Sequence, residues 1–170
     1  MIIQQAIKKG SILLGSGKTK TKALDSELIL SNLLNIKREQ LLLFEHQKLD
    51  DDLYNKFISL MKKRSKNLPV SYIINKKEFW SLDFEVNKHT LIPRPETELM
   101  VEGLVKHGKR QAKILDIGTG SGCIIISLLK ELKLATGIGV DICPKAISMA
   151  KKNARTHKIT NRIKFFTMSV

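Results

Sequence analysis

The sequence has little of what marks secreted, metal-binding or membrane-spanning proteins. Its two cysteines, Cys123 and Cys143, form no C-x-x-C pair, so we expect reduced thiols and a cytoplasmic protein. The four histidines are scattered without the spacing of metal ligands, which argues against a metal site. No apolar run approaches the roughly 20 residues that span a bilayer. Residues 1–9 also lack the charged-then-apolar order of a secretory signal, so we expect no membrane contact.

Acidic and aromatic residues are scarce as well. Thirty basic residues face 16 acidic ones, which gives a formal net charge of +14, and aromatic residues make up 5% of the chain. Such a balance raises nucleic acid as a partner. The lysines, however, are spread along the whole chain, with no arginine-rich tract and no interleaved aromatic residues that would stack on bases. The pattern favours a solvated lysine-rich surface. A weak contact with ribosomal or transfer RNA is left open as the alternative.

One segment resembles a phosphate-binding loop but lacks its first glycine. Gly15-Ser16-Gly17-Lys18-Thr19 matches the end of the pattern G-x-x-x-x-G-K-[ST]. The first glycine of that pattern would stand at position 12, which is Ile12. We therefore interpret this segment as a flexible loop between helices.

The first part of the chain, residues 1–68, has the pattern of a small helical bundle. Leu53, Phe57 and Met61 recur at helical spacing after a run of acidic residues that begins at Asp50 and can cap the helix start. Residues 69–92 follow as a linker, because Leu68-Pro69 cannot continue a helix. Within this linker, residues 78–80 and 82–86 are predicted to form two short strands of a hairpin.

Two prolines fix the backbone at the start of the last part of the chain, residues 93–170. Pro93 and Pro95 hold their predecessors extended, and Pro95 with the acidic residues after it suits the first turn of a helix. This rigid segment either serves only to start a core helix or places Arg94 and Thr97 beside a ligand.

A strand, a glycine-rich turn and a helix follow. Leu115-Asp116-Ile117-Gly118-Thr119-Gly120-Ser121-Gly122 stands between two apolar stretches, which suits close approach of a nucleotide-like ligand to helix N-terminal amides. A second strand pattern ends at Asp141, whose carboxylate can accept both hydroxyls of a ribose. The turn and Asp141 together predict a half-site for a cofactor that contains adenosine.

The glycine spacing distinguishes between two cofactor classes. In the dinucleotide pattern G-x-G-x-x-G the third glycine would fall at position 123, which is Cys123. The third glycine is Gly122 instead, and the pattern G-x-G-x-G after an acidic residue resembles the loop of methyltransferases that use S-adenosyl-L-methionine. A fragment of a nicotinamide-dependent enzyme is the alternative.

The chain resembles the release factor glutamine methyltransferases, the PrmC or HemK family, over nearly its whole length. The segments that carry the resemblance are Pro69 to Ile73, Phe79 with the following hairpin, Ile92-Pro93-Arg94-Pro95-Glu96-Thr97-Glu98, Leu115 to Gly122, and Val140-Asp141-Ile142. It implies an α/β protein with an N-terminal helical bundle for substrate recognition, a β-hairpin linker and a Rossmann-like methyltransferase domain.

The same resemblance implies an activity and a set of site residues. The activity is transfer of a methyl group from S-adenosyl-L-methionine to the glutamine amide in the Gly-Gly-Gln motif of peptide chain release factors. By motif match, the loop Gly118, Thr119, Gly120, Ser121 and Gly122 would hold the methionine moiety and Asp141 the ribose. Pro93, Arg94, Pro95 and Thr97 would line the pocket.

The sequence departs from the family in lacking the methyl-transfer motif Asn-Pro-Pro-Tyr. An amide nitrogen is a poor nucleophile and needs fixed acceptors to orient it, and no residue here supplies an evident substitute, so no residue is named catalytic. We expect a truncated domain with strand order 3-2-1, without the remaining strands, and inactive by itself. An isolated domain, a shortened gene product and half of a split gene, completed by a separate C-terminal polypeptide, are all left open. A non-catalytic module that docks a release factor or RNA is the alternative function.

Overall fold

The computed structural model describes residues 1–15 and 20–169, which form two compact units: a helical unit, residues 1–74, and a sheet unit, residues 75–170. Each unit has its own hydrophobic core. The segment that resembles a phosphate-binding loop lies, apart from Gly15, outside the described residues. No helix in the described ranges combines the length and apolar character needed to cross a membrane.

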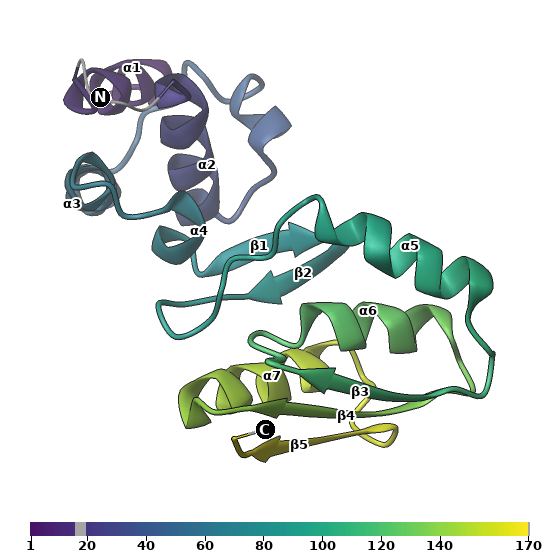
Figure 1. The fold of residues 1–170 in the computed structure, drawn as a ribbon. Coiled ribbons are helices and arrows are strands. Elements are labelled where there is room, and N and C mark those ends of the chain that lie inside the picture. The colour runs from purple at the N-terminus through teal and green to yellow at the C-terminus, as the bar shows by residue number, and fades with distance from the viewer. Residues whose placement is uncertain (16–19, 170) are drawn as a thin grey trace. The chain divides into compact units, whose positions relative to one another are not determined.

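The helical unit confirms the helical pattern of the N-terminal sequence. Buried Ile29, Leu30, Phe57 and Met61 lie in its core. The carboxylate of Asp50 accepts the first free N–H groups of the third helix, as the acidic run predicted, with 2.9 Å to the nitrogen of residue 52. The elements, seen in Figure 1, are α1 (Ile3–Leu13), α2 (Lys22–Leu34), the 3-10 helix η1 (Arg38–Leu41), α3 (Asp51–Ser65) and the short α4 (Val70–Ile73).

The sheet unit begins with the predicted hairpin, formed by β1 (Lys76–Phe79) and β2 (Leu82–Glu85). The predicted first strand, residues 78–80, was misplaced: β1 starts two residues earlier, and Trp80 belongs to the turn. The two-residue turn of the hairpin, Trp80 and Ser81, has φ angles of 52° and 54°, which glycine usually supplies in such turns. The Trp80 backbone N–H donates to the Glu98 carboxylate at 2.9 Å, and the indole N–H donates to a Glu131 carboxylate oxygen at 3.0 Å. These two acceptors offset the cost of the left-handed turn.

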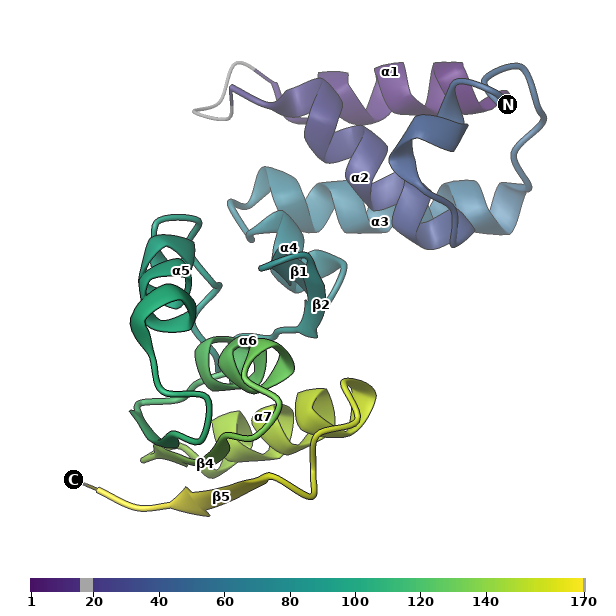
Figure 2. The same cartoon turned by 90° about the vertical axis from the view of Figure 1, so that its right-hand side faces the viewer.

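A parallel sheet with helices on one face makes up the rest of this unit. β3 (Lys113–Ile117), β4 (Thr136–Asp141) and β5 (Ile163–Thr167) lie in the order β3-β4-β5. The connecting helices α6 (Cys123–Glu131) and α7 (Pro144–Thr156) pack on one face of this sheet, and α5 (Thr97–His107) packs against α6 (Figures 1 and 2). Such a sheet fits a partial Rossmann-like domain.

The opposite face of the sheet is apolar and exposed. Four large apolar side chains on it are between 42% and 61% exposed: Leu115, Ile117, Ile138 and Phe166. Val140, which lies between Ile117 and Phe166, is 3% exposed. Parallel sheets are normally covered on both faces. Within the described residues β3 also has only β4 as a neighbour, so one edge of β3 is unpaired.

Candidate functional site

Three glycines turn the chain from the end of β3 into α6. Gly118, Gly120 and Gly122 have φ angles of 76°, 55° and 80°, a region that residues with a side chain rarely adopt. At Gly122 a Cβ atom would lie 2.9 Å from the Ile126 Cδ1 atom and 3.3 Å from the Ala150 Cβ atom, so this glycine allows α6 to start close to α7.

The first two glycines of the loop face open space. A Cβ atom at Gly118 would meet nothing within 4 Å, and one at Gly120 would meet only the Gly118 carbonyl oxygen, at 3.9 Å. Packing therefore does not explain why these positions lack side chains. Both fit a cradle in which a ligand approaches the backbone closely.

Backbone hydrogen bonds fasten this loop to the ends of two strands. The N–H groups of Gly118 and Thr119 both donate to the Val140 carbonyl, each at 2.9 Å. The Thr119 hydroxyl donates to a carboxylate oxygen of Asp116 at 2.7 Å. The loop is thus fixed before any ligand binds, which lowers the entropic cost of binding.

Asp141 lies next to the loop at the end of β4, as the sequence predicted. One of its carboxylate oxygens accepts the Gly120 N–H at 2.9 Å, and the other accepts the Cys143 N–H at 2.8 Å. Because an ionised carboxylate has about four acceptor sites, two stay available for the hydroxyls of a ribose. The two N–H groups fix the direction in which those sites point.

A second carboxylate, Asp116, flanks the loop. Burial raises the pKa of Asp116, the hydrogen bonds from the Thr119 hydroxyl and the Ile125 amide lower it, and the negative charge of Asp141 raises it again. Two carboxylates at the ends of β3 and β4, on either side of the loop, favour a ligand with a positive charge there. The sequence showed Asp116 only as the acidic residue before the glycines, and its position at the end of a strand was the signal for this role.

No sequence pattern indicated a role for Asn153. This side chain is 1% exposed, and its amide nitrogen donates to the Ser121 carbonyl at 2.9 Å and to the Glu85 carbonyl at 3.0 Å. Its amide oxygen accepts the Glu85 N–H at 2.9 Å. Asn153, on α7, therefore ties the glycine-rich loop to the hairpin strand β2.

The cysteine that follows the loop is unsuited to nucleophilic chemistry. Burial raises the pKa of the Cys123 thiol to about 11, and hydrogen bonding from the neighbouring Ser121 opposes this only in part. Among the described residues, no group of histidine, cysteine or acidic side chains is arranged to hold a metal ion.

The segment predicted to line the pocket precedes and begins α5. Pro93 is buried, Arg94 and Pro95 are exposed, and Thr97 is half-buried. The helix starts at Thr97 rather than at Pro95, because the N–H of Thr97 bonds the Arg94 carbonyl in a turn, at 3.1 Å. In the part of the chain that the structure describes, no hydrogen bond joins this segment to the glycine-rich loop, so its pocket-lining role stays a prediction.

Comparison with known proteins gives two family matches. Residues 5–74 match the PrmC N-terminal domain, and residues 108–168 match a methyltransferase domain. A release factor glutamine methyltransferase from Buchnera aphidicola is 41% identical over 81% of this chain and 50% of its own length. Relatives of the same name from Dictyoglomus turgidum and Nitratidesulfovibrio vulgaris are 37% and 32% identical over 84% and 96% of this chain and 51% and 56% of their own lengths.

Among solved structures, the METTL16 methyltransferase domain superimposes with a TM-score of 0.43 at 22% identity, covering 71% of this chain and 46% of that one. The chain spans about half the length of the three bacterial relatives named above. Its methyltransferase domain is of the kind that uses S-adenosyl-L-methionine as cofactor. The chain belongs to the release factor glutamine methyltransferase family.

Proposed function

We propose that this chain provides the cofactor-binding part of a cytoplasmic enzyme that methylates the glutamine amide of the Gly-Gly-Gln motif in peptide chain release factors. The family matches support this activity. The observation that carries the cofactor assignment is the open space at Gly118 and Gly120 next to the oriented carboxylate of Asp141.

Each part of the loop has a role in this proposal. Residues 118–122 hold the methionine moiety, Asp141 binds the ribose, and Asp116 contributes negative charge near the ammonium group. Pro93, Arg94, Pro95 and Thr97 line the pocket from the start of α5. When bound, the cofactor supplies an electrophilic methyl group.

The proposal also covers the domains. Residues 1–68 recognise the release factor, residues 69–92 link the two parts, and residues 93–170 form one half of a doubly wound sheet in the order 3-2-1. Further strands and helices, in the same or a separate polypeptide, would cover the exposed face that includes Leu115 and Phe166. Because the sequence has no Asn-Pro-Pro-Tyr motif to orient the amide, residues 1–170 would bind cofactor without transferring the methyl group.

Calorimetry of the 170-residue chain with three ligands tests the cofactor assignment. S-adenosyl-L-methionine and its demethylated product are expected to bind more tightly than NAD. Replacement of Asp141 by alanine removes two hydrogen bonds to the ribose, each worth about 1.5 to 3 kcal/mol, so affinity should fall by at least about 100-fold. Asp83→Ala removes an exposed carboxylate of the same unit and should leave affinity unchanged.

Two glycine substitutions, one in the loop and one on α5, test the same assignment by a second route. Gly120→Ala places a methyl group in the cradle and should abolish binding, whereas Gly103→Ala, on α5, meets nothing within 4 Å and should bind as the unchanged chain does. Circular dichroism would establish that each variant folds. Tighter binding of NAD, or a Gly120→Ala variant with full affinity, would refute the assignment.

A further inference from the structure

The charges of the sheet unit are distributed unevenly along the sequence. Asp141 is the last acidic residue of the chain. The residues after it include seven basic side chains and no acidic one: Lys145, Lys151, Lys152, Arg155, Lys158, Arg162 and Lys164. Since α7 and β5 carry most of them, the positive charge gathers on these two elements.

Two hollows lie along α7, and both are bordered by basic side chains. The first, of about 450 Å³, lies between α7 and the loop after β2, and its lining includes Lys145, Lys152 and His89. The second, of about 380 Å³, lies between α7 and β5. Arg155 lines both hollows, so they lie next to each other on α7, and we call the two together the α7 surface.

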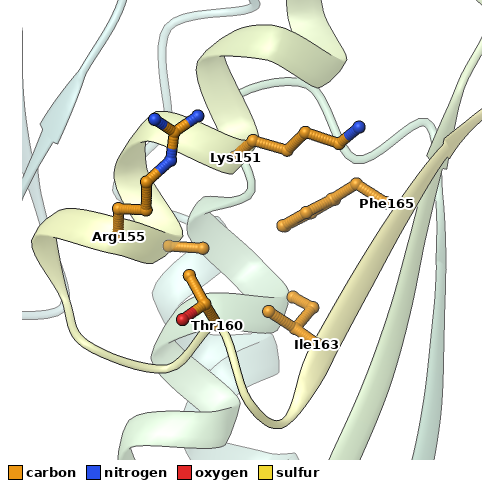
Figure 3. A pocket seen from close by; sticks show the side chains of 6 residues that line it. Lys151, Arg155, Thr160, Ile163 and Phe165 are labelled. Carbon is orange, nitrogen blue, oxygen red and sulfur yellow. The ribbon is translucent and has the colours of Figure 1, made fainter.

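The second hollow combines charge with an apolar floor. Figure 3 shows Lys151 and Arg155 projecting from α7, and Ile163 and Phe165 rising from β5 around the same space. The Phe165 ring lies over β4, where a Cβ atom at Gly139 would come within 2.6 Å of it. Because Ile163 and Phe165 are each 7% exposed, this floor is small, and the charged rim dominates the lining.

Most of this positive charge is not neutralised within the protein. Lys152 pairs with Glu85 at 2.6 Å, but Lys145, Lys151 and Arg155 form no ion pair among residues 1–15 and 20–169. The local field also acts on His89, whose pKa is lowered by desolvation and by the nearby Lys145 and Lys88. The α7 surface therefore has a positive potential that attracts anions.

We propose that the α7 surface binds single-stranded RNA through its phosphate backbone, a property beyond the methyltransferase function. The cations are spread along the helix instead of converging on one point: Lys145 and Arg155 are about 15 Å apart along the axis at 1.5 Å per residue. That length is much greater than a single phosphate group, so a polyanion can contact the cations at both ends, whereas a small anion would contact only one end. Ile163 and Phe165 are each 7% exposed, so the floor of the second hollow adds a small apolar contact and the cations carry the binding.

Fluorescence anisotropy with a labelled oligouridine of about 15 nucleotides tests this proposal. For single strands, each contact between a cation and a phosphate contributes about −0.7 to the slope of log affinity against log salt concentration. Three unpaired cations therefore predict a slope of about −2, so affinity should fall roughly 20-fold between 50 and 200 mM KCl. The double variant Lys151→Glu, Arg155→Glu leaves Lys145 as the one unpaired cation that can contact a phosphate. Its salt dependence should shrink to about threefold, and its affinity at 50 mM KCl should fall at least about 10-fold.

A matched control distinguishes the effect of the α7 surface on RNA affinity from the effect of the overall charge of the chain. Lys8→Glu, Lys9→Glu makes the same change of charge on exposed side chains of α1 and should leave RNA affinity within about twofold. The neutral pair Lys151→Gln, Arg155→Gln should reproduce the loss without introducing repulsion.

Several outcomes would overturn the proposal: no binding of oligouridine by the unchanged chain at 50 mM KCl, an equal loss in the α1 control, or binding to vesicles of anionic lipid without binding to RNA. Calorimetry with S-adenosyl-L-methionine on the same variants should give unchanged affinity. A failure of RNA binding is thereby distinguished from a failure of the methyltransferase assignment.

Discussion

Replacement of Asn153 by alanine is expected to destabilise the sheet unit by roughly 3 kcal/mol. The buried amide makes three hydrogen bonds, two to Glu85 and one to the Ser121 carbonyl, and each contributes about 1 kcal/mol to stability. The Glu85 N–H and the two carbonyl groups would lose these partners in a buried place, which adds to the cost. The glycine-rich loop would also lose its connection to β2.

Guanidinium unfolding followed by tryptophan fluorescence measures this effect, because the chain has one tryptophan, Trp80, which lies in the sheet unit. The midpoint should fall without a change in slope. Asn153→Asp keeps the size and the acceptor for the Glu85 N–H but turns a carboxylate toward carbonyl oxygens, so it should destabilise at pH 7 at least as much. Asn161→Ala, at an exposed position of the same unit, should change stability by less than about 0.5 kcal/mol.

Two results would refute this reasoning about Asn153. One is an alanine variant whose unfolding free energy lies within about 0.5 kcal/mol of the unchanged chain, since a buried amide with three partners cannot be neutral. The other is an Asp variant more stable than the alanine variant at pH 7, which would mean that the retained volume and the retained bond from the Glu85 N–H outweigh the two lost donated hydrogen bonds.

Two further predictions concern ionisable groups of the site. At pH 8 the Cys123 thiol, with a pKa of about 11, is ionised in about one molecule in a thousand. A thiol reagent should therefore modify Cys143 in the folded chain and both cysteines after unfolding. Rapid modification of Cys123 in the folded state would contradict its burial. Because burial raises the pKa of Asp116, the folded state favours its protonated form, and the chain should lose stability as pH rises from about 3.8 through the raised pKa. Asp116→Asn should therefore be more stable than the unchanged chain at pH 7, with a difference that disappears toward pH 3; a variant less stable at pH 7 would contradict this.

Local sequence patterns predicted the elements that depend on short-range interactions. The alternation in Leu82, Phe84 and Val86 predicted β2, and the glycine-rich loop predicted the strand before it and the helix after it. The carboxylate at the end of β4 was also predicted, because parallel strands bring their carboxyl ends to one edge of the sheet.

Long-range contacts and unusual backbone could not be predicted in this way. Asn153 is separated by 68 residues from Glu85 and by 32 from Ser121, and nothing in its neighbourhood distinguishes it from other polar residues of an amphipathic helix. The turn at Trp80 and Ser81 carries no glycine to mark its left-handed backbone, since distant carboxylates stabilise it. Both features exist only once the sheet unit has folded.

The order of the strands has a consequence for how the chain is made. β3, β4 and β5 follow one another in sequence with a single helix between each pair, so each pairing closes a shorter loop than a pairing of non-consecutive strands would. During synthesis the ladders among the described residues can form once Met168 has left the ribosome, because the Met168 N–H donates to the Asp141 carbonyl at 3.1 Å, next to the last residue pair of β4 and β5. From that moment the exposed face with Leu115, Ile138 and Phe166 is a surface to which chaperones or other nascent chains can bind.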